Sequence, residues 1–569
     1  MLVTLAVLLP TLLTIIGLIF DGGMMTTQQM DQQHVTDAAA LAAAVDIRTN
    51  ESQRVNATAA SSFGRLPRMD GVVVETFCPP RSGRYAGDSR YVEVLGETRY
   101  QTSMMSMFSG YRASSLRSRA VAGVAPSGPG AALVVLDPLP APLSIADWTS
   151  LLQNTTHPEF LDAAGETLDL LGVLEHLPLL SAVLDGLLQQ QLTDCLLQTV
   201  TETWDLLVTR CVPIALPALT AGLEIEGLGS LTVEGAVHVN NRWGGVDECG
   251  ERAGIGPALP AAVACMPLVP TTRLITPQIR VVGGVDDPRN YRPLDPAADP
   301  PLRANQLPVP DPLADLSAPT TSGVRAGDVV AVAVDTKAAE LLLDRLSGAL
   351  SVLLRPVFDT VRPLLHRRLT QVTLHPGVYD SLTVLAPGGG AVLQPGVYVI
   401  RGKNPATGLS LCLLGPVHAE GVLFCIQDPG HGRAGHDGLL GPEPAGSAST
   451  EPPPRPHAVD LLPSVVIAPL LPGGRLTGLQ DPDSPYRDML IYQQRSDRRP
   501  ILLEGQHLVG GGDLSGTVYA PWGHVSLVSG AARHDLRIVS GTARVLTVGD
   551  TTLAPQSLFR PAEDVVLVE

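Results

Sequence analysis

The chain has 569 residues and a formal net charge of −17, with 17% charged and 4% aromatic residues. Because single hydrophobic cores seldom grow beyond about 300 residues, this length predicts several domains. The acidic balance excludes nucleic acid as an expected partner, since that binding depends on neutralising phosphates with Lys and Arg. Glycine and proline, at 56 and 50 residues, predict a turn-rich chain, but their share is below that of a collagen-like or disordered one.

The first feature along the chain is an uncharged apolar run from Leu2 to Phe20. As a helix rising 1.5 Å per residue, this run would span about 28 Å, close to one hydrocarbon core. A cleavable signal peptide is the alternative, but no basic segment precedes the run and no small-residue cleavage site directly follows it. We therefore predict a single-pass transmembrane anchor at residues 1–24, with the C-terminal bulk of the chain exported.

Residues 25–140 predict a helix followed by a small sheet. The alanine-rich block from Ala38 to Ala44 has the highest helix propensity available, so the first helix is expected to continue beyond the apolar run. Further along, residues 91–94 alternate between apolar and polar types, as a half-buried strand does. The arrangement expected for this segment is pilin-like α+β.

This N-terminal segment resembles that of the TadG-like proteins of the tight-adherence (Flp) pilus assembly system. In that family an apolar run is followed by an Asp-x-Gly-like exit, and then by a Gln four residues before Asp-Ala-Ala-Ala-Leu-Ala. Family members usually carry basic residues before the apolar run, whereas this chain begins inside it. The positions that match the family motif are Asp21, Gln33, Asp37, Ala38, Ala39, Ala40, Leu41 and Ala42.

The resemblance implies a membrane-anchored, exported structural protein of the tight-adherence pilus system, acting in assembly, adhesion or scaffolding. Its expected partners are the membrane, through the N-terminal helix, and other pilus-assembly or cell-envelope proteins. Its expected location is the inner (cytoplasmic) membrane, with the bulk of the chain in the periplasm or at the cell surface. No enzymatic activity, cofactor or metal is expected.

Two segments carry leucines at helical spacing and predict helical inserts. The first is residues 141–215, with Leu184 and Leu188, and the second is residues 326–371, with Leu342. Such apolar stripes are typical of helices packed on their own domain or on each other. Helices that bind a membrane surface or a partner are the alternative, which the lack of a Lys/Arg excess on the polar face disfavours.

Short strands between Gly and Pro turns are predicted for residues 216–285, 372–428 and 461–569. Two PGVY phrases, Pro376–Tyr379 and Pro395–Tyr398, lie 19 residues apart in this region. A turn and a short apolar strand repeated at this period are what stacked solenoid rungs require, so we predict a right-handed parallel β-helix. A β-sandwich is the alternative, because it also uses short strands between Gly/Pro turns. Similar phrases follow TadG-like segments in large exported bacterial proteins, which favours the solenoid. The expected fold is thus mixed, and β-rich in its C-terminal part.

Two segments of biased composition predict chain without a core of its own. Residues 286–325 are rich in proline and are expected to form a linker, and residues 429–460 are expected to form a flexible loop. Neither has enough apolar residues to fold alone.

Six of the seven cysteines form neighbouring pairs with spacings of 16, 16 and 13 residues, while Cys78 is left over. No CxxC motif occurs, which disfavours a structural zinc site. If the bulk of the chain is exported, local disulfides are expected. The candidate bridges are Cys195–Cys211, Cys249–Cys265 and Cys412–Cys425, with a buried thiol as the alternative for Cys195.

Catalytic motifs are weak. His534 and Asp535 are adjacent, and adjacent residues of a strand point to opposite faces, so they predict no dyad. The acidic segment at 481–487 carries Asp481, Asp483 and Arg487 between prolines and is expected to be a turn. The alternative to a structural protein is a surface-tethered carbohydrate-active β-helix enzyme, and a surface glycan is a further candidate partner.

Overall fold

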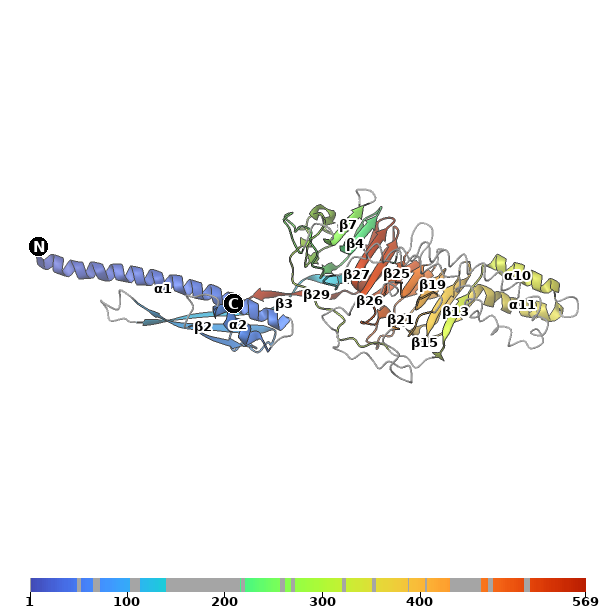
Figure 1. Cartoon of the computed structure of the whole chain (residues 1–569), viewed down its shortest axis with the longest axis horizontal. Coiled ribbons are helices and arrows are strands. Elements are labelled where there is room, and N and C mark those ends of the chain that lie inside the picture. Colours follow the sequence, from blue (N-terminus) through green and yellow to red (C-terminus); the bar gives the residue numbers. More distant parts are fainter. Residues whose placement is uncertain are drawn as a thin grey trace. The chain divides into compact units, whose positions relative to one another are not determined.

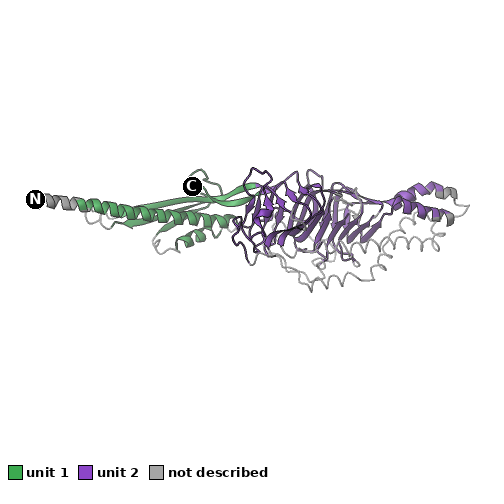
Figure 2. Ribbon diagram, turned by 90° about the horizontal axis from the view of Figure 1, so that it is seen from above, with its two compact units in different colours: residues 1–128, 561–569 green, residues 129–560 purple. Residues whose placement is uncertain are grey.

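The computed structural model describes residues 2–48, 53–64, 72–102, 113–139, 215, 221–255, 261–267, 272–319, 324–349, 355–386, 388–404, 407–429, 462–468, 474–505 and 512–569, and on the first helix the side chains of residue 12 and from residue 14 onward. The chain forms two compact units, unit 1 (residues 1–128 and 561–569) and unit 2 (residues 129–560), which are coloured separately in Figure 2. The mixed, β-rich fold predicted from the sequence is confirmed.

Unit 1 packs a long helix against a small antiparallel sheet. Its helices are α1 (Leu2–Arg48) and α2 (Val55–Gly64), and its strands are β1 (Val73–Phe77), β2 (Tyr91–Gln101) and the first part of β3 (Ala113–Val135). Strand β2 pairs with β1 on one side and with β3 on the other, both antiparallel. The residues of α1 that pack on the sheet recur every three or four positions, as one helix face does; they include Val35, Ala39, Ala40, Ala43 and Ala44.

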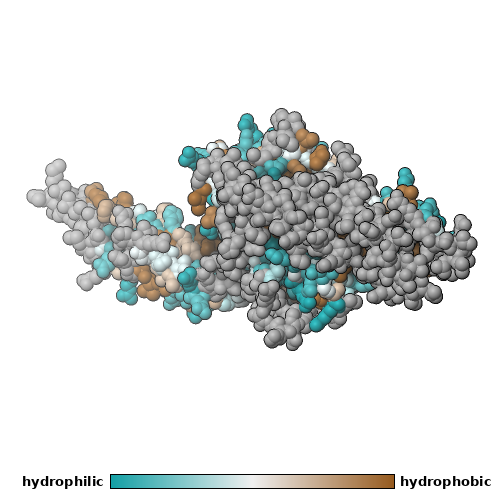
Figure 3. Space-filling model, turned by 45° about the vertical axis from the view of Figure 1, so that its right-hand side comes forward, coloured by the Kyte–Doolittle hydropathy of each residue, from teal (hydrophilic) through white to brown (hydrophobic). Residues whose placement is uncertain are grey.

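The start of α1 presents apolar side chains at its surface. Among the described residues, no helix carries an apolar stretch long enough to cross a membrane. Within the apolar run, the large apolar side chains that are roughly half exposed or more include Leu12, Ile15, Ile16, Leu18, Ile19 and Phe20. Apolar residues at the surface of the chain are brown in Figure 3.

Unit 2 consists of short strands that pair in parallel (Figure 1). In chain order the strands after β3 are β4 (Ala221–Gly227), β5 (Leu231–Val233), β6 (Ala236–Val239), β7 (Ala261–Pro267), β8 (Leu274–Ile275), β9 (Ile279–Val281), β10 (Tyr291–Arg292), β11 (Leu302–Arg303), β12 (Val324–Arg325), β13 (Asp328–Val332), β14 (Gln371–Leu374), β15 (Gly377–Tyr379), β16 (Ser381–Leu385), β17 (Gly390–Leu393), β18 (Gly396–Ile400), β19 (Leu411–Leu414), β20 (Val417–Ala419), β21 (Val422–Ile426), β22 (Val465–Ala468), β23 (Gly474–Thr477), β24 (Met489–Gln493), β25 (Ile501–Glu504), β26 (Gly512–Ser529), β27 (Arg533–Thr547), β28 (Thr551–Leu553) and β29 (Phe559–Leu567).

From β12 to β23, each strand pairs with the strand three places further along the chain. Every third strand therefore joins the same ladder, and the described strands make three ladders: ladder 1 through β15, β18 and β21, ladder 2 through β16, β19 and β22, and ladder 3 through β17, β20 and β23. The long strands β26 and β27 contribute successive segments to all three. This parallel pairing differs from the antiparallel hairpins that a β-sandwich would show.

One apolar cluster fills the space that the three ladders share. It takes alternate residues from each strand, as the two-residue period of a strand requires. In ladder 1 the register places one column of these residues directly above one another, and every one is at least 98% buried: Tyr398, Phe424, Ile491, Val518, Ile538, Leu133, Val237, Ile279 and Leu302.

The last strands of unit 2 pair with its first ones. Strand β27 pairs with both β3 and β4, and β28 pairs with β5. The chain thus builds one stack outward from β3 to β11 and a second from β12 to β28, and the end of the second joins the start of the first. Residues about 400 positions apart, such as Ile538 and Leu133, become neighbours in this way.

Residues 286–319, within the predicted linker, are held against the ladders. They include β10, β11 and a segment of residues 304–319 that we call the strap. Leu313, Leu316 and Ala318 of the strap pack on an apolar cluster that includes Tyr519. Because the neighbouring residue Val518 faces the interior, Tyr519 points outward, and the strap lies on the outer face of ladder 1. The linker expectation missed this because it weighed composition alone, whereas the polar strap gains partners from distant strands.

The second predicted insert contains helices α10 (Thr336–Ala349) and α11 (Arg355–Thr370), inserted between β13 and β14. Arg362 of α11 pairs with Glu340 and Asp344 of α10, the latter at 2.8 Å. The first predicted insert, apart from Ala215, and the predicted loop at 429–460, apart from its first residue, lie outside the described residues.

Candidate functional sites

The family-motif segment of α1 is fastened to the sheet of unit 1 by hydrogen bonds. The amide Nε2 of Gln32 donates to the carbonyl of Gly96 at 2.8 Å and lies 3.1 Å from the hydroxyl of Ser118. One turn later, the Thr36 hydroxyl lies 2.6 Å from the same Ser118 hydroxyl. We call Gln32, Thr36, Gly96 and Ser118 the helix–sheet clasp. Gln32 and Thr36 are fully buried, so these bonds satisfy polar groups that water cannot reach.

The motif residues Gln33 and Asp37 lie beside the clasp. Gln33 Nε2 donates to the Asp37 carboxylate at 2.7 Å and to the Arg119 carbonyl at 2.8 Å. The four-residue spacing matters because it puts both side chains on one face of the helix. Asp37 thereby orients the amide that bonds to β3.

The remaining motif residues have different surroundings. Ala39 and Ala40 are fully buried against the sheet, while Ala38 is exposed and Leu41 and Ala42 are partly buried. The small side chains of Ala39 and Ala40 let α1 approach the sheet closely enough for the clasp bonds to form. Asp21, at the end of the apolar run, is also buried.

An ion-pair network adjoins the motif on β3. The Arg119 guanidinium lies 2.7 Å from the Glu93 carboxylate and 2.6 Å from that of Glu569. Burial raises the pKa of Glu93, but hydrogen bonds from Ser82, Arg119 and the Arg81 backbone outweigh it and leave the pKa below its ordinary value. The Arg119 hydrogen bond lowers the pKa of Glu569.

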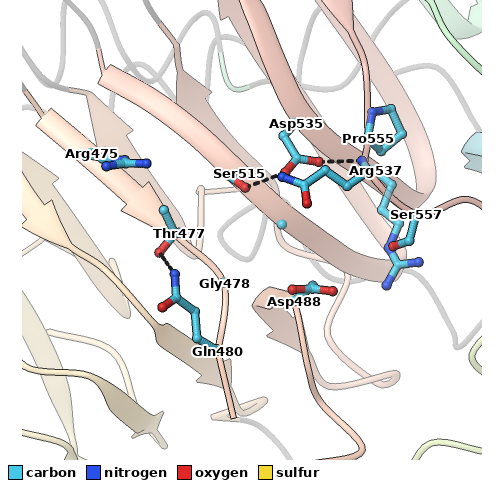
Figure 4. A pocket seen from close by; sticks show the side chains of 12 residues that line it. Arg475, Thr477, Gly478, Gln480, Asp488, Ser515, Asp535, Arg537, Pro555 and Ser557 are labelled. Carbon is cyan, nitrogen blue, oxygen red and sulfur yellow. Dashed lines mark hydrogen bonds between the residues drawn. The ribbon is translucent and has the colours of Figure 1, made fainter. Parts of the chain in front are cut away.

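A polar pocket of about 210 Å³ lies in unit 2 near the ends of β23, β26 and β27 (Figure 4). The ladder register creates it, because Thr477, Ser515 and Asp535 are successive partners across ladder 3. The charged side chains of Asp488 and Arg537 also line the pocket, close to these strands.

Two glycines line this pocket at positions where a side chain does not fit. A Cβ at Gly478 would lie 2.5 Å from the Asp488 carbonyl oxygen, and Gly516 has φ +129°, a conformation that side chains rarely adopt. At these two positions, the close packing and the conformation of the backbone therefore require glycine.

The charged groups of the pocket are held in place. Arg537 Nε donates to the Thr517 hydroxyl at 2.6 Å, and its guanidinium carbon lies 4.8 Å from the Phe559 ring centroid. Burial lowers the pKa of Arg537, and the nearby Asp488 and Asp535 act in the opposite direction. Asp535 accepts hydrogen bonds from Ser515 Oγ at 3.0 Å and from the Gln556 backbone at 2.7 Å.

These groups can bind a small polar molecule, because they present donors and acceptors around one hollow. A metal centre finds no support, since no group of three or more His, Cys, Asp or Glu side chains within the described part of the chain could hold an ion.

The comparison with protein families decides what the N-terminal segment resembles. Residues 1–46 match a family described as putative Flp pilus-assembly TadE/G-like. This match covers the motif residues of α1 and the two clasp residues on that helix, Gln32 and Thr36. It supports a role in the tight-adherence pilus system and an association with pilus-assembly components. No curated protein and no solved structure matches the chain.

Two of the three predicted disulfides fall on described residues, and neither of these two is formed. Cys249 and Cys265 are free thiols, the first exposed and the second buried, so the predicted bridge between them is not formed. Cys412 and Cys425 belong to different apolar clusters, on ladders 2 and 1 respectively, because thirteen residues carry the chain from one ladder to another; no disulfide joins the two. Cys195 and Cys211 lie outside the described residues.

Sequence reasoning missed several residues of both sites. Gln32 and Thr36 repeat the four-residue spacing of Gln33 and Asp37, and that repetition was the available signal. Asp535 lines the pocket while the adjacent His534 bonds instead to the Ser529 hydroxyl at 2.8 Å. Asp481 accepts from the backbone of Asp483 at 3.1 Å, as a turn residue does, and neither lines the pocket.

Proposed function

We propose that the chain is a membrane-anchored, exported structural component of the tight-adherence pilus system. The observation that carries the proposal is the TadE/G-like match at residues 1–46, which coincides with helix α1. The beginning of α1 is the anchor, in the inner membrane, and the rest of the chain is exported. The uncharged run Leu2–Phe20 and the exposed side chains between Leu12 and Phe20 support this role.

The clasp gives the anchor a mechanical function. A membrane helix that continued into water without side contacts could pivot freely about the segment that follows it. Gln32 and Thr36 instead join α1 to β2 and β3 by buried hydrogen bonds. A pull on the membrane segment is therefore carried into the sheet of unit 1.

Unit 2 supplies the scaffold in this proposal. Its three ladders are the faces of a parallel β-helix, and each coil contributes one strand to each ladder. The winding is right-handed, as it is in most parallel crossover connections. The parallel pairing of every third strand and the shared apolar interior support this assignment. Such a solenoid offers a long surface for assembly, adhesion or scaffolding contacts.

A non-enzymatic role is part of the proposal. The strap covers part of the outer face of ladder 1. The acidic residues Asp481 and Asp483 lie on an exposed turn. No specific observation on the described residues favours the enzymatic alternative.

The experiment is deletion of the gene from its host, followed by complementation with the full chain. Surface pili are counted by electron microscopy and attachment to a surface is measured in parallel. We expect deletion to reduce both and the full chain to restore both. Unchanged pili and attachment after deletion would contradict the proposal, as would sustained release of products when the purified chain is incubated with glycans.

A further inference from the structure

The pocket of unit 2 combines hydrogen-bond donors and acceptors in nearly equal measure. Asp488 and Asp535 offer carboxylate oxygens that accept, Arg475 and Arg537 offer guanidinium groups that donate, and the Gln480 amide does both. A ligand with many groups that both donate and accept matches such a lining. Hydroxyl groups on neighbouring carbons are of this kind.

The charge of the lining selects against ionic ligands. Its two arginines and two aspartates balance each other. Two exposed partners outside the lining also balance, Glu420 beside Arg475 at 3.2 Å and Arg487 beside Asp488 at 3.9 Å. An anionic ligand would meet the two carboxylates, and a cationic ligand would meet the two guanidinium groups. The pocket therefore favours a neutral ligand.

The size and stiffness of the pocket restrict the ligand further. A volume of about 210 Å³ accommodates one small ring with its substituents. Asp535 is fixed by two hydrogen bonds, and Arg537 by Thr517 and the Phe559 ring. Groups that are already oriented lose little entropy on binding, which favours recognition of a single ring.

We propose that this pocket binds one neutral pyranose unit of a glycan. Asp488 and Asp535 accept hydrogen bonds from sugar hydroxyls, and Arg537 donates to a hydroxyl or ring oxygen. Figure 4 shows Asp488, Asp535 and Arg537 around the same hollow. This binding requires no covalent bond to be broken. Sugar binding is an addition to the proposed role in the pilus system, and that role would stand even if no sugar bound.

The experiment is a titration of the full chain with a panel of neutral monosaccharides and oligosaccharides, and with uronic acids of matched size. Asp488→Asn is the main variant, because asparagine tolerates the positive φ of 62° at this position and the side chain is half exposed. Gln480→Ala is a second surface variant. Asp483→Asn is the matched control, since it makes the same chemical change at an exposed residue that does not line the pocket.

We expect at least one neutral sugar to bind saturably, and both pocket variants to weaken that binding at least tenfold, while Asp483→Asn leaves it unchanged. The proposal is overturned by the absence of neutral-sugar binding, by tighter binding of uronic acids, or by full affinity in the Asp488→Asn chain. Release of free sugar from a bound oligosaccharide would also overturn it, because it would show hydrolysis.

Discussion

At the scale of single residues, unit 1 depends on buried polar side chains that form hydrogen bonds between α1 and the sheet. Gln32 carries no charge and could not be distinguished by residue type from its neighbours Gln28, Gln29 and Gln33. Its importance comes from its place on the buried face of α1, opposite Gly96 and Ser118. Removing one partner of such a bond leaves the other without solvent or protein contact.

Gln32→Leu tests the clasp. Leucine fills a similar volume but removes the donor to the Gly96 carbonyl, so we expect a loss of about 1–3 kcal/mol in the free energy of unfolding of unit 1. Gln29→Leu is the matched control, because Gln29 is exposed on the same helix. Thermal or urea unfolding measures both, and equal stabilities of the two variants would contradict the account.

Arg119→Gln tests the ion-pair network through its pH dependence. Because folding lowers the pKa of Glu93 and Glu569, their contribution to stability is present above about pH 4.3, the ordinary pKa of Glu. It is lost as the pH falls through the lowered folded-state values. The variant should therefore have a lower Tm than the wild type at pH 7, and the difference should shrink at pH 3.

The control for this series is Arg117→Gln on the same strand. The pair between Arg117 and Glu97 is exposed, and such pairs contribute little. A Tm difference for Arg119→Gln that is the same at both pH values would show that the carboxylates are not involved.

At the scale of elements, the repeated strands could be predicted from the sequence, but the register in which they pair could not. In both PGVY phrases the Tyr hydroxyl donates to the carbonyl four residues earlier, at 2.8 Å for Tyr398, and Tyr379 makes the same bond. The ladder nevertheless pairs Gly377 with Tyr398, not with Gly396. In the related phrase GTVY, Val518 and not Tyr519 faces the core. The two-residue period of strands is visible in a sequence, whereas register depends on loop lengths and distant partners.

The strap is held by contacts that the composition of residues 286–325 does not reveal. Asp311 accepts from the Tyr519 hydroxyl at 2.7 Å, and Arg495 donates to the carbonyls of Leu313, Ala314 and Leu316. These partners are separated by about 180 to 210 residues in the sequence, and no local pattern marks them. The pocket was hidden for the same reason, since Ser515 and Asp535 meet only through the ladder register.

Tyr519→Phe tests how the strap is held. The change removes the hydroxyl that accepts from Arg495 at 2.8 Å and donates to Asp311, so we expect proteolysis within residues 304–319 to become at least several-fold faster. Tyr398→Phe is the control, because it removes a buried hydroxyl that contacts Leu374 and Gln394 and not the strap. Equal cleavage rates of the strap in the two variants would contradict the assignment.

At the scale of the whole molecule, unit 2 is completed only when its last strands reach its first. Ile538 lies between Val518 and Leu133 in the core column of ladder 1, and it therefore belongs to both stacks. Contacts of such long sequence separation form late and at a high entropic cost. The two stacks should accordingly depend on one another for stability.

Ile538→Ala tests this dependence. The change removes buried volume at the joint and should cost about 2–5 kcal/mol, with faster hydrogen exchange in both β4 and β26. Ile279→Ala is the matched control, since Ile279 lies between Val237 and Leu302 within the first stack. Faster exchange confined to β26 in Ile538→Ala would show that the stacks fold independently.

The proposed anchoring of the chain in the membrane by the beginning of α1 is tested most directly in cells. The direct measurement is fractionation of cells that express the full chain, with alkaline extraction of the membranes. We predict that the wild type stays in the membrane pellet and that Ile15→Lys with Ile19→Lys, two changes at exposed positions of α1, releases it into the soluble fraction. Extraction of the wild type as readily as the variant would contradict the account.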